Sequence, residues 1–206
     1  MPLADQPLRQ LLTAFSSSDP TPGGGSASAL SAALGASLLM MVAALPKTRT
    51  GADTERPLLA DAAAALGGIR ARLTDAIDAD AAAYDRVVAA YKLPKQSADE
   101  QAARKAAIQQ ALRDATDVPL DVMRMAAAAI GHARTIAANG HRAAASDVGV
   151  AAALLRAGLR GAALNIDINA GSVSDTAYVD GVRAESAHLL DSAARTADEA
   201  EALLRG

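Results

Sequence analysis

The stretch "DPTPGGGSASALSAALGASLLMMVAALPK", residues 19–47, carries no charged side chain between its two end residues. Three consecutive glycines precede a run in which leucines are interspersed with Ala, Ser and Gly. The run is long enough to span a bilayer, which needs about 20 apolar residues. Its small residues contribute little to insertion, however, and neither Trp nor Tyr marks its ends. We therefore expect a central helix that is buried by neighbouring helices, and no membrane association.

The composition of the whole chain predicts a helical bundle. Hydrophobic residues make up 51% of the 206 residues and aromatic residues only 2%, while Ala occupies more than a quarter of all positions. Ala is the best helix former but fills a core poorly, so the helices must approach closely or bury large faces against one another. We expect a single all-α domain over residues 1–206, with long antiparallel helices, that assembles into an oligomer.

Charge and composition argue against several functional classes. The net charge is −3 and the aromatic faces on which single-stranded bases stack are almost absent, so no nucleic-acid partner is expected. The chain has no Cys, which excludes disulfides, thiolate metal sites and a cysteine nucleophile. The first five residues lack the basic and apolar regions of a secretory signal, so we expect a cytoplasmic location.

Apolar residues recur at helical spacing almost throughout, and no run is typical of a β-strand. Ser97 and Glu100 form a capping-box pattern that begins a helix running towards Asp117. Pro119 fits the first turn of a separate, following helix. Ser146 or Asp147 is the expected N-cap of the helix after that. The predicted helices cover residues 6–15, 25–45, 53–91, 97–117, 119–138, 146–170 and 174–204.

The glycines before the central helix are not explained by packing alone. Glycines at a helix start let a ligand reach the unbonded N–H groups that carry the positive end of the helix dipole. The alternative is a plain loop in which the serine after the glycines caps the helix. The pattern by itself leaves both interpretations open. The residues concerned are Pro22, Gly23, Gly24, Gly25 and Ser26.

Polar residues within otherwise apolar helices are further candidates. Asp80 and Tyr84 lie at positions i and i+4 and share a helix face. Asn165 and Asn169 also lie one turn apart, where a buried amide needs hydrogen-bond partners. Asp147 points the same way as Asn165 but lies about 27 Å from it in a continuous helix. These residues therefore serve opposite ends of a long ligand, or a second copy of the chain brings another set of groups alongside.

Metal and nucleotide motifs are absent from the sequence. The histidines, His132, His141 and His188, lack the spacing of metal ligands, and neither a nucleophile elbow nor a Walker loop occurs. We therefore expect no metal and no cofactor, and neither covalent nor nucleoside-triphosphate chemistry.

Four motifs occur in order along the chain: "PTPGGGSASALSAALGASLLMMV", "IDADAAAYDRVVAAYKLPK", "ATDVPL" and "SDVGVAAALLRAGLRGAALNIDIN". In this order and spacing they resemble the cyclodeaminase/cyclohydrolase family. That family comprises the C-terminal half of formiminotransferase-cyclodeaminase and the stand-alone bacterial methenyltetrahydrofolate cyclohydrolases. The resemblance covers nearly the whole chain. It implies an all-helical homodimer with a folate site at or near the dimer interface.

The resemblance also suggests roles for the candidate residues. Asp80 or Asp147 is the expected catalytic carboxylate, acting as general base on a folate. Asn165 and Asn169 are expected to bind the pterin edge or the reacting oxygen. The glutamate carboxylates of the ligand suit the glycine-flanked helix start and the basic residues that follow the central helix. The expected substrate-binding residues are Pro22, Gly23, Gly24, Gly25, Ser26, Lys47, Arg49, Tyr84, Ser146, Asn165 and Asn169.

Three functions remain open on this basis. The leading hypothesis is hydrolysis of 5,10-methenyltetrahydrofolate to 10-formyltetrahydrofolate, since no formiminotransferase domain accompanies the motifs. The sister reaction, release of ammonia from 5-formiminotetrahydrofolate, would use the same groups. A catalytically inactive folate-binding or structural dimer is the third possibility. It is favoured by two departures from the family pattern: "ALPKTR" at 44–49 replaces an Asn-Leu-Thr with a basic cluster and Tyr, and His141 stands where Asn is common.

Overall fold

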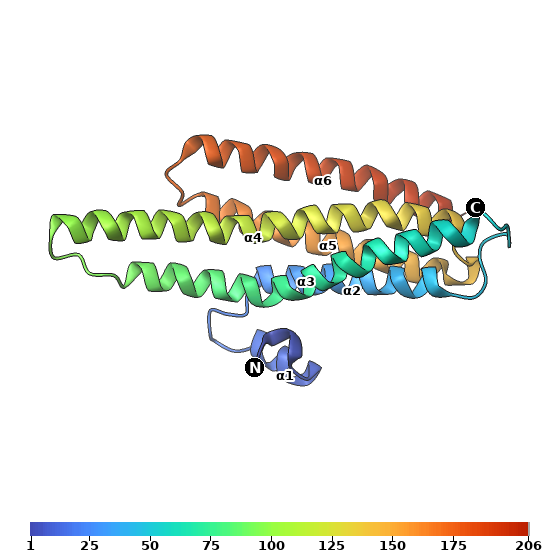
Figure 1. Ribbon diagram of the computed structural model, residues 1–206, viewed down its shortest axis with the longest axis horizontal. Coiled ribbons are helices and arrows are strands. Elements are labelled where there is room, and N and C mark those ends of the chain that lie inside the picture. Colours follow the sequence, from blue (N-terminus) through green and yellow to red (C-terminus); the bar gives the residue numbers. More distant parts are fainter. Residues whose placement is uncertain (206) are drawn as a thin grey trace.

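The computed structural model describes residues 1–205 and is built almost wholly of helices (Figure 1). The long helices α2 to α6 run side by side in a bundle, and the short helix α1 lies outside it (Figure 1). The only sheet-like pairing in the described chain is an isolated bridge between Thr48 and Gly140. The predicted all-α fold is confirmed. The helices are α1 (Leu8–Phe15), α2 (Gly24–Ala44), α3 (Glu55–Tyr91), α4 (Ala98–Asn139), α5 (Ala145–Ala170) and α6 (Thr176–Leu204), with 3-10 turns at Leu3–Asp5 and Arg142–Ala144.

Helix α2 is the central element that the uncharged stretch predicts. It packs along α3 and α5 and also contacts α4. Its small side chains, such as Ala29, Ala32 and Ala36, are completely hidden from solvent. Within residues 1–205, α2 is also the one helix long and apolar enough to cross a membrane, and half of its most apolar window is buried inside the bundle.

Small residues allow α2 and α5 to approach closely. A Cβ atom on Gly158 of α5 would lie 2.6 Å from the Ser28 carbonyl oxygen and 2.9 Å from the Ala32 Cβ. A Cβ atom on Gly35 of α2 would lie 2.9 Å from the Ala151 carbonyl oxygen. Later residues of α2 thus meet earlier residues of α5, which makes the two helices antiparallel. Because the glycines have no side chain, the backbone of the facing helix can occupy the space that a larger residue would fill.

The predicted break before Pro119 is wrong, because residues 98–139 form one continuous helix, α4. Proline lacks an N–H, and its ring crowds the carbonyl four residues earlier. That carbonyl belongs to Ala115, and the side-chain Nδ2 of Asn169 donates to it at 2.7 Å. A neighbouring helix therefore supplies the bond that proline removes. The predicted capping box of Ser97 and Glu100 at the start of α4 is confirmed.

The start of α5 also differs from the prediction. The helix begins at Ala145, and its N-cap position is Ala144, which makes no side-chain capping bond. Neither Ser146 nor Asp147 is the cap, because the 3-10 turn Arg142–Ala144 leads directly into the helix and moves its start forward. Both side chains therefore lie within the first turn of α5.

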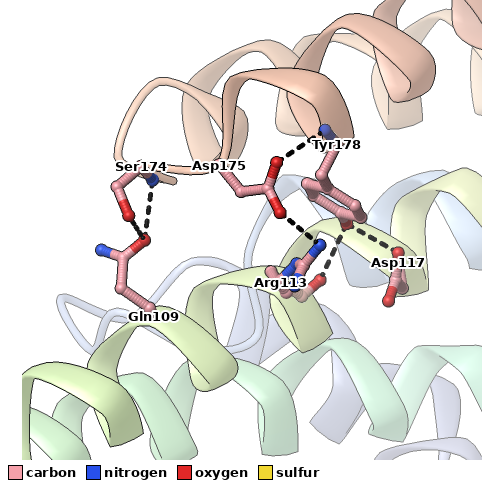
Figure 2. A network of polar contacts seen from close by, with 6 residues as sticks. All are labelled: Gln109, Arg113, Asp117, Ser174, Asp175 and Tyr178. Atoms are coloured by element: carbon pink, nitrogen blue, oxygen red, sulfur yellow. Dashed lines mark hydrogen bonds and ion pairs between the residues drawn. The ribbon is translucent and has the colours of Figure 1, made fainter.

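Polar contacts attach the beginning of α6 to α4 (Figure 2). They hold the turn after Ala170 in place, and with it the end of α5 that carries the two candidate asparagines. The Arg113 guanidinium also lies over the aromatic ring of Tyr178, 4.5 Å from the ring centroid. The pairs are Gln109 with Ser174 (2.7 and 2.8 Å), Arg113 with Asp175 (3.0 Å) and Asp117 with Tyr178 (2.7 Å).

We expect Gly158→Ala to lower the free energy of unfolding by about 1–3 kcal/mol, because the added methyl group overlaps the backbone of α2. Gly131→Ala in α4 is the matched control, since nothing lies within 4 Å of a Cβ atom there. That change should be neutral or stabilising by up to about 1 kcal/mol. Urea unfolding of both variants measures the difference. Equal effects would contradict the close approach of α2 and α5.

Candidate active site

A cavity of about 300 Å³, called the Asp80 cavity below, lies where the N-terminal end of α2 meets α3, α4 and α5. It is at the lower end of the range for small-molecule pockets, about 300–1,000 Å³, and so matches one ring system rather than a whole folate. Residues from all four sequence motifs meet here. The predicted site residues that line the cavity are Gly23, Gly24, Asp80, Tyr84, Asn165 and Asn169.

Asp80 of α3 binds the first turn of α2. Its Oδ2 accepts from the Ser26 backbone N–H at 2.8 Å and lies 3.1 Å from the Ser26 hydroxyl. That hydroxyl also lies 2.8 Å from the Ile77 carbonyl oxygen. The N-cap of α2 is Gly23, which has no side-chain capping bond. The interpretation of Ser26 as the cap of its own helix is therefore wrong, because its hydroxyl is directed towards α3.

Gly25 makes room for Asp80. A Cβ atom at this position would lie 2.5 Å from the Asp80 Cγ, a distance that no side chain tolerates. Gly25 itself is buried, whereas Gly23 and Gly24 border the cavity. The three glycines thus divide two tasks: one admits a carboxylate from α3, and two expose backbone to the cavity.

Burial raises the pKa of Asp80 above its ordinary value of 3.8, although the hydrogen bonds from Ser26 act in the opposite direction. A carboxylate with a raised pKa is a stronger base once ionised. Asp78, two residues earlier, faces elsewhere and accepts from the backbone N–H groups of Leu3 at 2.5 Å and Ala4 at 3.2 Å. Of this acidic pair, Asp80 is the one that reaches the cavity.

Asn165 and Asn169 both use their amide nitrogens within the protein. The Asn165 Nδ2 donates to the Gly161 carbonyl at 2.8 Å, and the Asn169 Nδ2 donates to the Ala115 carbonyl at 2.7 Å. Each amide oxygen is then the atom best placed to meet a ligand. Together with the Asp80 carboxylate, the cavity offers three acceptors, which suit a ligand edge with several N–H donors.

Asp147 and Ser146 lie at the opposite end of the bundle. Helix α5 is continuous from Ala145 to Ala170, so Asp147 stands about 27 Å from Asn165. Ser146 is exposed and Asp147 is partly buried. Within one chain, neither residue reaches the Asp80 cavity.

A second cavity, of about 600 Å³, lies at this far end of the bundle, between the segment after α2 and the turn before α5. The predicted residues Lys47 and Arg49 line it, together with Arg56, His141 and Arg142. Such a concentration of basic side chains favours an anionic group. The predicted substrate-binding residues therefore form two groups, at opposite ends of the bundle.

Arg49 is also built into the scaffold. Its guanidinium donates to the carbonyls of Ala137 at 2.9 Å and Leu203 at 3.2 Å, close to the ends of α4 and α6. Carbonyls in the last turn of a helix lack a helical partner, so these bonds satisfy them. Arg56 does the same for α2 by donating to the Leu45 carbonyl at 2.8 Å. This structural role could not be read from the sequence, because only the fold brings the helix ends beside the arginines.

Glu55 organises the loop that carries Lys47 and Arg49, and sequence reasoning missed it. Its carboxylate accepts from the Thr48 hydroxyl at 2.5 Å and from the backbone N–H groups of Thr50 and Gly51 at 3.1 Å. These bonds, led by that from Thr48, lower the pKa of Glu55 from 4.5 to about 2. The available signal was an acidic residue in the first turn of a helix behind a Thr- and Gly-containing loop.

The lowered pKa of Glu55 predicts a pH-dependent contribution to stability. The contribution is complete above the ordinary pKa of 4.5 and is lost as the pH falls towards about 2. Glu55→Gln should therefore lower the midpoint of thermal unfolding at pH 7, and its difference from the wild type should shrink between pH 4.5 and 2. Glu199→Gln, in an exposed pair with Arg134, is the control and should change the midpoint little. A pH-independent difference for Glu55→Gln would contradict the network.

An all-helical bundle with a small cavity of mixed polar and apolar lining and a half-buried carboxylate has the features of a small-molecule enzyme. The sequence model of the formiminotransferase-cyclodeaminase family matches residues 7–188, and the chain belongs to this family. Within residues 1–205, no group of three His, Asp or Glu side chains is arranged to hold a metal ion.

Three known proteins illustrate the relationship. Methenyltetrahydrofolate cyclohydrolase of Methylorubrum extorquens is 40% identical over 176 residues, which is 85% of each chain. Formimidoyltransferase-cyclodeaminase of Sus scrofa is 36% identical over 195 residues, which is 93% of this chain but only 35% of the pig protein. The crystal structure of formiminotetrahydrofolate cyclodeaminase from Thermotoga maritima has a TM-score of 0.87 at 26% identity and covers 98% of this chain and 97% of that chain. The predicted family is confirmed.

Proposed function

We propose that the chain hydrolyses 5,10-methenyltetrahydrofolate to 10-formyltetrahydrofolate in the Asp80 cavity. The observation that carries the proposal is a carboxylate with a raised pKa beside the N-terminus of α2, facing two asparagine side chains. The relative named methenyltetrahydrofolate cyclohydrolase supports it, because the alignment covers the same large share of both chains.

In the proposed reaction, Asp80 acts as base and then as acid. It takes a proton from a water molecule as the oxygen bonds to the cationic methenyl carbon between N5 and N10. Its negative charge also stabilises that cation before attack. The bond between this carbon and N5 then breaks, Asp80 returns the proton to N5, and the hydroxyl proton leaves to solvent as the formyl carbonyl forms. The net change is addition of water and release of one proton.

The pterin end of the folate is the part that suits the Asp80 cavity. Its ring N–H and amino groups are donors, which complement the oxygens of Asn165 and Asn169. A glutamate carboxylate in the same place would face the Asp80 carboxylate, and like charges repel. We therefore expect the pterin end at the glycine-flanked helix start, where the sequence alone suggested the glutamate end. The glutamate end suits the basic cavity with Lys47 and Arg142 instead.

A homodimer would bring the two kinds of cavity together. Helices α2 and α5 leave large apolar side chains exposed at helical spacing, among them Leu34, Met41, Val150, Leu164 and Ile168. The most exposed are Leu164 at 58% and Ile168 at 76%. An apolar face of this kind marks an interaction surface. Antiparallel pairing of two copies across it would set the basic end of one chain against the Asp80 cavity of the other.

Ammonia release from 5-formiminotetrahydrofolate is the second candidate, favoured by the likeness to the Thermotoga maritima cyclodeaminase. In that reaction N10 attacks the carbon of the protonated formimino group and gives its proton to Asp80, which passes it to the departing nitrogen, so that ammonia leaves and the methenyl cation remains. Both reactions pass through a tetrahedral carbon bonded to N5 and N10, and both would use the same residues. Incubation with each substrate, while methenyl absorbance is followed, separates them.

We expect Asp80→Asn to lower kcat by about 10²- to 10⁴-fold. The variant should keep or raise the midpoint of thermal unfolding at pH 7, because the amide removes a buried charge while its oxygen can still accept from Ser26. Asp61→Asn, at an exposed position of α3, is the control and should leave both quantities unchanged. Turnover of neither folate by the wild type would contradict both enzymatic functions, and full activity of Asp80→Asn would contradict the assigned base.

The dimer is tested by Leu164→Glu, which places a charge in the apolar face. Sedimentation should show a mass near the 20.7 kDa of one chain, whereas Leu58→Glu in α3 should leave the dimer intact. An unchanged mass for Leu164→Glu would contradict the interface.

A mixing experiment tests whether one site contains residues from both copies of the dimer. If Asp147 of one copy serves the Asp80 cavity of the other, co-refolding Asp80→Asn with Asp147→Asn should restore about a quarter of wild-type activity, since half of the dimers would carry one intact site. An active Asp147→Asn homodimer, or no recovery on mixing, would contradict the shared site.

A further inference from the structure

Helix α4 is continuous through Pro119, and α5 bonds the carbonyl that this proline leaves without its usual donor. Proline has no N–H, so the Ala115 carbonyl lacks the donor that would follow it along a regular helix. Ala115 and Pro119 are both buried. The Asn169 Nδ2 donates to this carbonyl at 2.7 Å. Without Asn169 the carbonyl would be a buried acceptor lacking a partner, which costs stability.

The same contact orients the Asn169 amide. A carbonyl oxygen accepts hydrogen bonds and cannot donate them, so the amide must direct its nitrogen, not its oxygen, towards Ala115. Asn169 and Ala115 both line the Asp80 cavity. Because nitrogen and oxygen lie on opposite sides of one planar amide, fixing the nitrogen on α4 also fixes the oxygen.

Asn165 provides a comparison within the same cavity. Its Nδ2 donates to Gly161, four residues earlier in its own helix. That carbonyl is also the regular acceptor for the Asn165 backbone N–H, so the side chain shares an acceptor that is already satisfied. The Ala115 carbonyl, in contrast, has no such partner in its own helix. The constraint on Asn169 is therefore stronger than that on Asn165.

We propose that Pro119 is a positioning residue: by freeing the Ala115 carbonyl, it holds the Asn169 side chain as a hydrogen-bond acceptor and so makes the cavity selective for a ligand edge that carries N–H donors. The identity of that edge as a reduced pterin rests on the proposed function. The orientation of the amide is a property of the fold and does not depend on it.

A double-mutant cycle on thermal unfolding tests the contact without a ligand. Pro119→Ala restores the N–H that bonds Ala115 and should keep or raise the midpoint. Asn169→Ala should lower the midpoint by about 2–10 °C in the wild-type background, because it leaves the carbonyl unpaired. In the Pro119→Ala background the same change should cost less than half as much. Equal costs in the two backgrounds would overturn the proposal.

Kinetics test the effect on recognition. Pro119→Ala should raise KM for 5,10-methenyltetrahydrofolate about tenfold, the equivalent of one hydrogen bond, with kcat within about twofold because Asp80 is untouched. Pro57→Ala, at the exposed start of α3, is the matched control and should leave both constants unchanged. An unchanged KM for Pro119→Ala would overturn the positioning role. If the wild type turns over neither folate, the proposed function fails, and the unfolding cycle still decides whether Pro119 sets the amide.

Discussion

The candidate site depends on the contact between the Asp80 carboxylate and the first turn of α2. The carboxylate reaches the Ser26 N–H only because Gly25 has no side chain. The contact joins α3 to the start of α2, and the small residues farther along α2 hold α5 close enough to place Asn165 and Asn169 opposite. Burial of the carboxylate among these helices raises its pKa, although the hydrogen bonds from Ser26 lower it. One interaction thus sets both the shape of the cavity and the chemistry of its base.

The Ala-rich composition explains why polar contacts are so prominent at the ends of the bundle. Ala side chains bury little area each, so the interior stabilises the helices through close packing rather than through bulk. Helix ends still need partners for their unpaired carbonyls. Arg49 and Arg56 supply these for α2, α4 and α6, and Glu55 holds the loop between them. The basic cavity at this end is therefore framed by side chains that also hold the helix ends together.

Pro119 shows how a rule of local structure is broken and compensated across helices. A buried proline within a helix normally ends or bends it. Here the carbonyl that it frees is bonded by Asn169 of α5, so the cost at α4 is offset and the amide acquires a fixed direction. Sites where local preference and tertiary structure disagree are often functional, and this one lies on the wall of the Asp80 cavity.

The sequence by itself determined the central helix, the all-α fold and the candidacy of six residues that line the Asp80 cavity, because uncharged runs, helical periodicity and ordered motifs can be read along the chain. The capping box at Ser97 is of the same kind. Only the tertiary structure decided that α4 continues through Pro119, that Ser26 binds α3, and that Arg49 serves the ends of other helices. Each of these depends on a partner far away in the chain, and local patterns carry no information about which distant group will satisfy a polar atom.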